Sequence, residues 1–369
     1  MRDFGFAQED VQRGVSSGRA SSTHTHWKEW LQFCDQMGFD PLLKTVENKI
    51  PILQVFLHRV RHGPCAADKH NVKSRTAEEY IRSLAQTYLS LGAKDPRLTD
   101  GHNIDFRIRR MLNAYSKEDP PPNRVKPVPV QVLRNIMFIA KNSDDPALVM
   151  EADMIAMAFF FLLRPGEYTA TKSESTPFEL KDVQLWLGCV RLNLETATDA
   201  EILASTFGAL TFDKQKNSVR GEVIGHARSG DQDLCPVRCI ARRVVHLRRN
   251  HAAPNTPLAT AFQADGTTFR LKPAHITTTL KQAVTFLGSS ALGFLPADVS
   301  ARSLRAAGAN ALLCGGVDTD VIRLLGRWRS DEMLKYLHTS AEPLMRDYAR
   351  QMLTGGAFTL IPNQDCPSF

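Results

Sequence analysis

The segment Asp119-Pro-Pro-Pro-Asn-Arg-Val-Lys-Pro-Val-Pro129 decides how this 369-residue chain is divided. Five prolines in eleven residues exclude a helix interior, because proline lacks the amide hydrogen that a helix requires. The segment therefore predicts a stiff, extended connector whose basic residues, Arg124 and Lys126, face solvent or phosphate. Because the chain is longer than one ordinary domain needs, we place a linker between two domains at residues 116–130.

The residues before the connector predict a small helical domain at 21–115, preceded by a polar, loosely ordered arm at 1–20. Helix spacing of apolar residues begins the domain, at Trp27, Trp30, Leu31 and Cys34. Gly38 is expected to end this helix, and Pro51 suits the first turn of a second.

Two more helices complete the first domain in this interpretation. Thr76-Ala-Glu-Glu79 has the pattern of a capping box and predicts that a third helix begins there. Residues 104–114 predict a fourth helix. It carries three basic residues that are candidate contacts for the DNA backbone: Arg107, Arg109 and Arg110.

After the connector, residues 131–355 predict a mixed, mostly helical domain, with 356–369 as a tail. Residues 148–163 are apolar on all sides, which is typical of a buried helix. Alternating apolar residues at 178–187, 209–212 and 221–226 predict the strands of one small sheet. From residue 236 almost to residue 355 the chain is expected to be helical. The fold class is therefore mostly α with a small β-sheet.

Composition and charge favour a globular protein with a polyanionic partner. Hydrophobic residues make up 43% and charged residues 23% of the chain, which is an ordinary globular balance. The formal charge of +7 and the pI of about 9.1 suit a nucleic acid. No signal peptide is recognised at the start and no apolar run reaches membrane-spanning length. We expect a soluble, intracellular protein without a membrane partner.

The seven cysteines are odd in number and scattered, which argues against a disulfide framework. Cys235 and Cys239 form the only close pair. Their spacing would allow half of a zinc site, but no second pair follows with matching spacing. Buried thiols are therefore favoured over a metal site. No Asp/Glu cluster suggests catalytic magnesium, so we expect no cofactor or metal and disfavour a two-metal nuclease.

Two arginines occupy unusual places in the second domain. Arg164 ends the apolar helix, in Leu163-Arg-Pro-Gly-Glu167, where an unpaired charge at the edge of a core is costly. Its partner is either Glu167 or a phosphate, which a guanidinium binds through two hydrogen bonds. Arg305 lies beside a stripe of small and apolar residues: Leu304, Ala307, Gly308, Ala311 and Leu312. A second arginine at a core edge favours a shared anion site.

A third segment carries further candidate chemistry, in Leu324-Leu-Gly-Arg-Trp-Arg-Ser-Asp-Glu-Met-Leu-Lys-Tyr336-Leu-His. Asp318 or Thr319 is expected to cap a short helix that Gly326 ends. Ser330 or Asp331 can cap the following helix, which carries Tyr336. A tyrosine on a helix usually belongs to a core. Here two arginines and a tryptophan precede it within one domain, and this combination makes it a candidate nucleophile.

These three segments resemble the tyrosine recombinase (phage-integrase) family. The Gly-Arg-Trp-x-Ser variant of the third segment looks most like Crypton-type recombinases of eukaryotic mobile elements. The resemblance covers residues 20–350, because the first domain is similar to the family's helical core-binding domain. It implies a site-specific recombinase or integrase that cleaves and rejoins duplex DNA through a 3′-phosphotyrosyl intermediate. It also implies a monomer when free, a homotetramer on paired DNA sites, and a nuclear location if the source is eukaryotic.

The resemblance implies a role for each matching residue. Arg164 and Arg305 would bracket the scissile phosphate, Trp328 would occupy the family's late His/Trp position, and Tyr336 would be the nucleophile, with Tyr348 as the fallback. The family's general acid is a lysine on a β-hairpin. That position falls at Asp213-Lys-Gln-Lys216, where Lys216 is preferred over Lys214.

One position departs from the family pattern. Arg302 stands where the family often has a histidine, three residues before the second arginine. Arginine donates hydrogen bonds to phosphate but does not accept the tyrosine proton. Two alternatives therefore stay open: a DNA-binding protein derived from a recombinase that no longer cuts, and an enzyme of the type IB topoisomerase kind. A DNA substrate that traps the covalent intermediate would separate the three.

Overall fold

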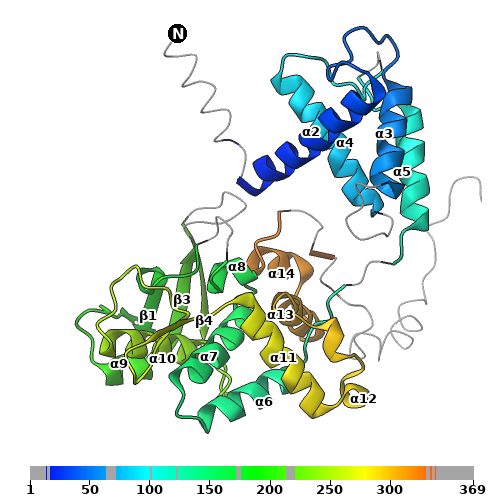
Figure 1. The fold of residues 1–369 in the computed structure, drawn as a ribbon. Helices are drawn as coiled ribbons and strands as arrows, with labels where there is room; N and C mark the ends of the chain where they lie inside the picture. The colour runs from blue at the N-terminus through cyan, green and yellow to red at the C-terminus, as the bar shows by residue number, and fades with distance from the viewer. Residues whose placement is uncertain are drawn as a thin grey trace, which may run out of the picture. The chain divides into compact units, whose positions relative to one another are not determined.

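The computed structural model divides the chain into two compact units, Met1–Pro122 and Asn123–Phe369 (Figure 1). The described part is mostly helical with a small antiparallel sheet, which confirms the predicted fold class. The structure describes residues 14, 17–63, 72–99, 102–121, 124–171, 176–212, 221–329, 333–334 and 337.

Among the described residues of the first unit there are four helices, as the sequence predicts: α2 (Ser17–Met37), α3 (Ile50–His62), α4 (Ser74–Ser90) and α5 (Phe106–Glu118). Gly38 follows α2 with a φ of 69°, a conformation that glycine adopts without strain. Pro51 lies in the first turn of α3. The carboxylate of Asp105 caps α5 by accepting from the amide of Arg107 at 2.8 Å. The core of this unit is aromatic, with the Trp30 and Phe56 rings packed edge to face at 4.9 Å.

Three expectations for this unit are wrong in detail. Residues 17–20 of the expected arm belong to α2. Leu31 is exposed, so it does not share the buried face of Trp30 and Cys34. Thr76 does not cap α4, because the helix begins earlier, at Ser74. The Asp119 carboxylate accepts from the amide of Ser74 at 2.8 Å and thereby satisfies the helix N-terminus from a distant part of the chain.

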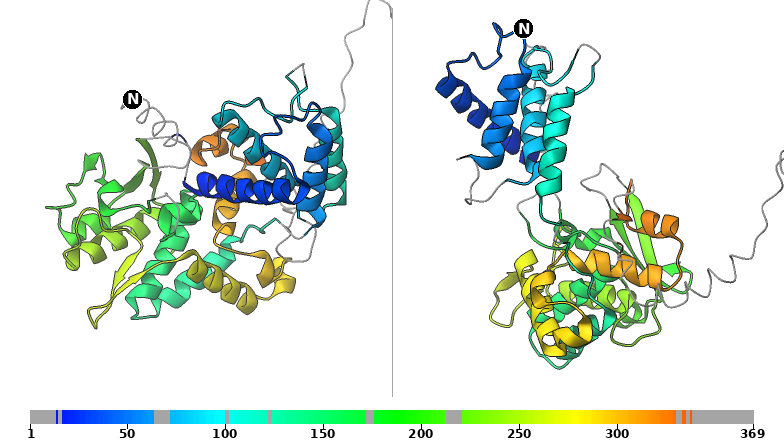
Figure 2. Two further views of the ribbon diagram at one scale, coloured as in Figure 1. Left: turned by 45° about the horizontal axis from the view of Figure 1, so that its top comes forward. Right: turned by 90° about the vertical axis from the view of Figure 1, so that its right-hand side faces the viewer.

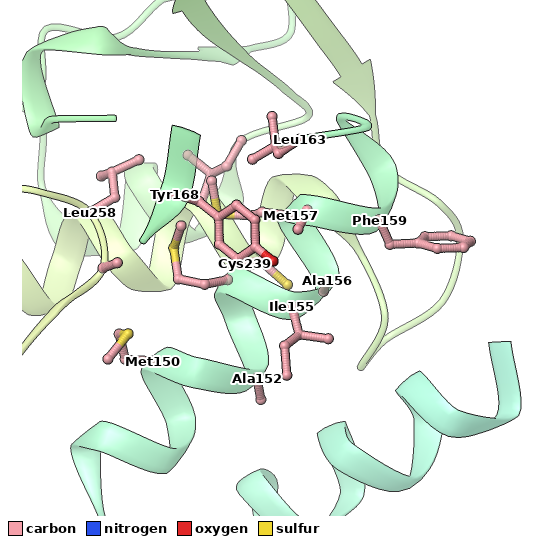
Figure 3. Packing of buried hydrophobic residues seen from close by; sticks show 14 of the residues in the cluster. Met150, Ala152, Ile155, Ala156, Met157, Phe159, Leu163, Tyr168, Cys239 and Leu258 are labelled. Carbon is pink, nitrogen blue, oxygen red and sulfur yellow. The ribbon is translucent and has the colours of Figure 1, made fainter. Parts of the chain in front are cut away.

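The second unit is built around α7 (Pro146–Phe160), which is buried on nearly all sides and confirms the predicted apolar helix. Figure 3 shows side chains from α7 and from neighbouring elements packed around Tyr168 and Cys239. The helices that pack against α7 are α6 (Val130–Lys141), α10 (Pro236–Arg249) and α13 (Ser303–Cys314). Because α7 is shared by all of these contacts, its C-terminal end is held firmly in place.

A four-stranded antiparallel sheet with the order β2-β1-β3-β4 forms the predicted small sheet. Phe207 pairs with Ala227 at one end of the β3–β4 ladder and Phe212 with Glu222 at the other. Residues 213–220, which connect these two strands, lie outside the described residues. The strands are β1 (Val183–Leu187), β2 (Val190–Arg191), β3 (Phe207–Phe212) and β4 (Glu222–Ala227). In Figures 1 and 2 the sheet (green) lies on one side of this unit, away from α11 and α12 (yellow).

A second, two-stranded sheet was not predicted, because the sequence after residue 236 is expected to be helical. Strands β5 (Thr260–Phe262) and β6 (Thr268–Arg270) pair antiparallel across a turn at Asp265-Gly266. Asp-Gly between alternating residues is a hairpin signal that the sequence does contain. The remaining short or peripheral elements are α8 (Pro165–Tyr168), η1 (Leu180–Asp182), α9 (Asp199–Ala204), α11 (Pro273–Leu287), α12 (Ser289–Leu292), η2 (Pro296–Asp298) and α14 (Thr319–Leu325).

The cysteines only partly follow the expectation of buried thiols. Cys34, Cys235 and Cys239 are buried, whereas Cys189 and Cys314 are exposed. Cys65 and Cys366 lie outside the described residues. In the described part of the chain, no helix combines the length and the apolar character that crossing a membrane requires.

Candidate active site

Arg164 lies just beyond the C-terminal end of α7. The chain leaves α7 at Phe161, and Arg164 then precedes the short helix α8. Glu167 accepts from the Arg164 amide at 2.7 Å and pairs with the Arg164 guanidinium at 3.0 Å. Glu167 is buried, but the side chain of Arg164 is 26% exposed. The predicted pairing with Glu167 therefore exists, and it leaves part of the guanidinium accessible to a further anion.

The C-terminal end of α14 has a Schellman motif with arginine at the position where glycine is usual. The amide of Trp328 donates to the Arg323 carbonyl at 3.0 Å, and the amide of Arg327 donates to the Leu324 carbonyl at 2.9 Å. Arg327 consequently has a φ of 57°, in the left-handed region. A non-glycine residue in that region costs about 1–2 kcal/mol. The surroundings of the Arg327 side chain must offset this cost.

The Arg327 side chain joins α14 to the end of α7. Its guanidinium donates to the carbonyls of Phe161 and Leu162, both at 3.1 Å, and lies 4.0 Å from the Phe212 ring centroid. It also pairs with Glu167 at 3.1 Å. A cation at the carbonyl end of α7 is favourable because that end of a helix carries partial negative charge. Burial lowers the pKa of Arg327, and Glu167 opposes this effect.

Arg305 contacts the same turn from α13. Its guanidinium donates to the Gly326 carbonyl and lies 4.3 Å from the Trp328 ring centroid, a cation–π contact. The sequence suggested that Arg305 lies at the edge of the core. In the structure it is only 3% exposed and therefore lies within the interior.

Close backbone packing brings α13 against the end of α7. A Cβ atom on Gly308 would lie 2.2 Å from the Phe159 carbonyl oxygen, which shows why this position has no side chain. The predicted small-residue stripe is correct at Leu304, Ala307 and Gly308, all of which are buried. It is wrong at Ala311, which is exposed, because α7 ends before reaching that turn.

Figure 1 shows α8, α13 and α14 gathered near one end of α7. A small second core joins these elements through the side chains of Leu162, Ala309, Ile322, Trp328 and Met333. Hydrogen bonds, ion pairs and a cation–π contact thus connect residues from three separate sequence segments. We call these residues the arginine cluster: Arg164, Glu167, Arg305, Arg327 and Trp328. The sequence did not lead us to predict Arg327 as a site residue. The signal that could have identified it is its position between Gly326 and Trp328.

Of the other candidate catalytic residues, the structure describes Arg302. Arg302 is exposed, and its backbone precedes α13. Tyr336 and the fallback Tyr348 lie outside the described residues, as do Lys214 and Lys216. The strands that flank the two lysines are present, and Phe212, where β3 ends, contacts Arg327. Asp318, one of the two predicted caps, does cap α14, by accepting from the amide of Asp320 at 2.7 Å. Ser330 and Asp331, the expected caps of the next helix, fall outside the described residues.

The predicted DNA contacts are all exposed: Arg107, Arg109, Arg110, Arg124 and Lys126. Arg107 already pairs with the capping Asp105 at 3.0 Å. Arg110 lies 5.8 Å from the Phe106 ring centroid. The α5 arginines therefore differ in how much of their charge is available to a partner.

A cationic groove between α2 and α4 was not predicted from the sequence. It has a volume of about 480 Å³ and is lined by Arg19, Ser22, Thr23, His26, Arg75, Thr76, Glu79, Arg82 and Ser83. Three arginines and several hydroxyl groups face one glutamate there. Burial lowers the pKa of His26, so the positive charge comes from the arginines. This combination of donors suits phosphate oxygens.

No protein-family model and no curated protein sequence matches the chain. Among solved structures, it is similar to the integrase of transposon Tn1549 in complex with transposon right end DNA, at 12% identity, with 90% of this chain and 99% of that chain covered and a TM-score of 0.42. It is also similar to a dimer of lambda integrase residues 75–356 bound to a COC′ core site, at 12% identity, with 92% of this chain and 96% of that chain covered and a TM-score of 0.46. The similarity to the XerA recombinase is at 13% identity, with 96% of this chain and 97% of that chain covered and a TM-score of 0.36.

Proposed function

We propose that this chain is a tyrosine recombinase that cleaves and rejoins duplex DNA. The observation that carries the proposal is the arginine cluster. Three sequence segments that separately suggest phosphate chemistry meet through the Arg164–Glu167–Arg327 pairs and the Arg305–Trp328 contact. A scaffold that buries several guanidiniums beside one carboxylate is suited to bind an anion.

The proposed reaction needs no metal ion. The phenolic oxygen of Tyr336 forms a bond to phosphorus, the bond from phosphorus to the 5′-oxygen breaks, and the 5′-oxygen takes a proton from Lys216. Arg164 and Arg305 stabilise the charge that develops on the phosphoryl oxygens. A charged phosphate oxygen accepts hydrogen bonds from arginine more strongly than a peptide carbonyl such as that of Gly326 does. The phenolic proton passes to water, because Arg302 is exposed and does not accept protons.

The DNA partner is supported by charge as well as by the cluster. The cationic groove of the first unit and the exposed α5 arginines supply contacts to backbone phosphates, together with Arg124 and Lys126. We further propose a monomer in free solution and a homotetramer on paired sites. The Gly-Arg-Trp-x-Ser segment is the basis for proposing a Crypton-like mobile-element origin, and a nuclear location would follow from a eukaryotic source.

The test is covalent trapping. A duplex nicked just downstream of the scissile phosphate loses a short fragment after attack, so the phosphotyrosyl adduct accumulates and is seen as a shifted band on a denaturing gel. The wild-type chain is expected to form the adduct and Tyr336→Phe to form none, with DNA binding nearly unchanged. An adduct with Tyr336→Phe would move the assignment to Tyr348. Binding without any wild-type adduct would indicate the non-cutting alternative, and relaxation without exchange between duplexes would indicate the topoisomerase kind.

The general acid can be identified with a modified leaving group. Replacing the bridging 5′-oxygen by sulfur creates a leaving group that departs without a proton. Lys216→Ala is expected to slow adduct formation by about 10²–10⁴-fold on normal DNA and to act at the wild-type rate on the sulfur substrate. If Lys214→Ala shows this pattern instead, the assignment of the lysine is reversed.

A further inference from the structure

We propose that Arg327 is a positioning residue that keeps the charge of Arg164 available for phosphate. This inference rests on the proposed function. Arg327 is 5% exposed and both of its terminal nitrogens are hydrogen-bonded to protein groups, so we place it in a supporting role and not at a reacting atom. Its effect on catalysis would pass through two other groups, the end of α7 and the carboxylate of Glu167.

The first effect is geometric. Arg164 follows Phe161 and Leu162 in the chain, and the Arg327 guanidinium binds the carbonyl of each, at 3.1 Å. It also donates to the carbonyl of Leu325, its own near neighbour, at 3.0 Å. One rigid planar group therefore ties the turn after α14 to the turn after α7. The path of the backbone into Arg164 is fixed from a residue that lies 165 positions from Leu162 in the chain.

The second effect is electrostatic. Each Glu167 oxygen is bound by a different guanidinium, Oε1 by Arg164 at 3.0 Å and Oε2 by Arg327 at 3.1 Å. A carboxylate paired with Arg164 alone would cancel its charge and repel an incoming phosphate. Sharing the carboxylate between two arginines leaves the trio with a net positive charge. Arg164 can then bind phosphate through its exposed edge while still being oriented by Glu167.

The two effects lead to an unusual expectation for paired substitutions. If Arg327 is lost, the carboxylate of Glu167 turns fully toward Arg164 and holds it. Removing that negative charge as well should release Arg164. The double variant Arg327→Gln/Glu167→Gln is therefore expected to be faster than Arg327→Gln alone. A merely structural role for Arg327 predicts the opposite, because two losses from one packed network then accumulate.

The experiment measures single-turnover adduct formation on the nicked duplex, together with equilibrium DNA binding. We expect Arg327→Gln to slow adduct formation at least ~10-fold with affinity unchanged within about twofold, and the double variant to recover the electrostatic part of that loss. The matched control is Arg323→Gln on the preceding helix α14, a partly exposed arginine paired with Asp320 at 3.1 Å, which should behave as wild type.

The outcomes are separable. A wild-type chain that forms no adduct on any duplex overturns the proposed function and this inference with it. A wild-type chain that forms the adduct, with Arg327→Gln equally fast or the double variant slower than Arg327→Gln, overturns the inference alone. Should Arg327→Gln unfold, Arg327→Met removes the charge with a long side chain that tolerates burial. Methionine then gives the same comparison, with Arg327→Met/Glu167→Gln expected to exceed Arg327→Met.

Discussion

The arginines of the two units lie in opposite surroundings. In the second unit, Arg305 and Arg327 are buried against aromatic rings and backbone carbonyls, and Arg164 is anchored by a buried carboxylate. In the first unit, Arg107 and Arg109 lie exposed on α5. Exposed charges attract a polyanion but are screened by salt and free to move. Buried, oriented charges cost free energy to assemble and can hold a particular anion in one geometry.

The largest expected difference between the two sets is in reaction rate. Arg164→Lys and Arg305→Lys should each slow adduct formation by ~100-fold or more, because losing one transition-state donor costs ~3 kcal/mol. Lysine keeps the charge but not the planar fork. Arg109→Lys on α5 should leave the rate unchanged. Single-turnover kinetics with saturating protein make the comparison, and full activity in either buried variant would remove that residue from the phosphate clamp.

A smaller effect is expected from disturbing the packing that holds the buried set together. Gly308→Ala forces α13 away from the Phe159 carbonyl, and Gly326→Ala forces the Trp328 ring away, since the new Cβ would lie 1.5 Å from its Cζ3 atom. Overpacking of this kind costs about 1–3 kcal/mol. Both variants should unfold at lower urea concentration and form adduct more slowly.

The control for this packing test is Gly315→Ala at the end of α13. A Cβ atom there meets its nearest neighbour, the Ala311 carbonyl oxygen, at 3.3 Å, so only a slight adjustment is needed. It should stay close to wild type in stability and rate. Wild-type rates in Gly308→Ala and Gly326→Ala would mean that the convergence of α7, α13 and α14 does not matter for the reaction.

The exposed set should govern salt dependence. Each phosphate contact contributes about 0.9 to the slope of log affinity against log salt, so the double variant Arg19→Gln/Arg75→Gln in the cationic groove should lower it by about 1.8. Arg107→Gln should change it less, because Arg107 already pairs with Asp105. Binding titrations between low and physiological salt give these slopes. Equal slopes for wild type and the double variant would exclude the groove as a phosphate contact.

The smallest expected effect concerns pH and a residue outside both sets. Burial, together with repulsion from Arg243, lowers the pKa of His246 to about 4, and its neutral Nε2 accepts from the amide of Phe262 at 3.1 Å. The unfolded chain binds this proton near pH 6.5. The unfolded state therefore holds more protons between pH 4 and 6.5, and stability is lost as the pH falls through that window.

Urea unfolding at several pH values measures this dependence. His246→Gln keeps an acceptor for the Phe262 amide but cannot be protonated, so its unfolding midpoint should fall less between pH 6.5 and 4. The control, His251→Gln, changes an exposed histidine and should follow wild type. Identical pH profiles for wild type and His246→Gln would show that this histidine does not couple to folding.

Local patterns predicted the elements of the fold well where the cause was local. Proline in a first turn, glycine after a helix, alternation in a strand and an all-apolar run each reflect the preferences of neighbouring residues, and α3, α2, β3 and α7 follow them. The errors arose where a distant group intervened. Thr76 does not cap α4, because the helix begins at Ser74, whose amide donates to the Asp119 carboxylate. Leu31 fits the helical period, yet the packing of the neighbouring helices leaves it exposed.

For the candidate site, the amino-acid sequence by itself determined which residues are chemically suited to phosphate: the arginines, the lysine pair and the tyrosine, in a spacing that resembles one family. Only the tertiary structure decided which of them meet. Arg327 reads as an ordinary surface residue in sequence, yet it binds carbonyls and a carboxylate that lie about 160 positions earlier in the chain. The reason is physical: a residue's type fixes what it can donate or accept, whereas burial and partners depend on how α7, α13 and α14 pack, and no local pattern encodes that.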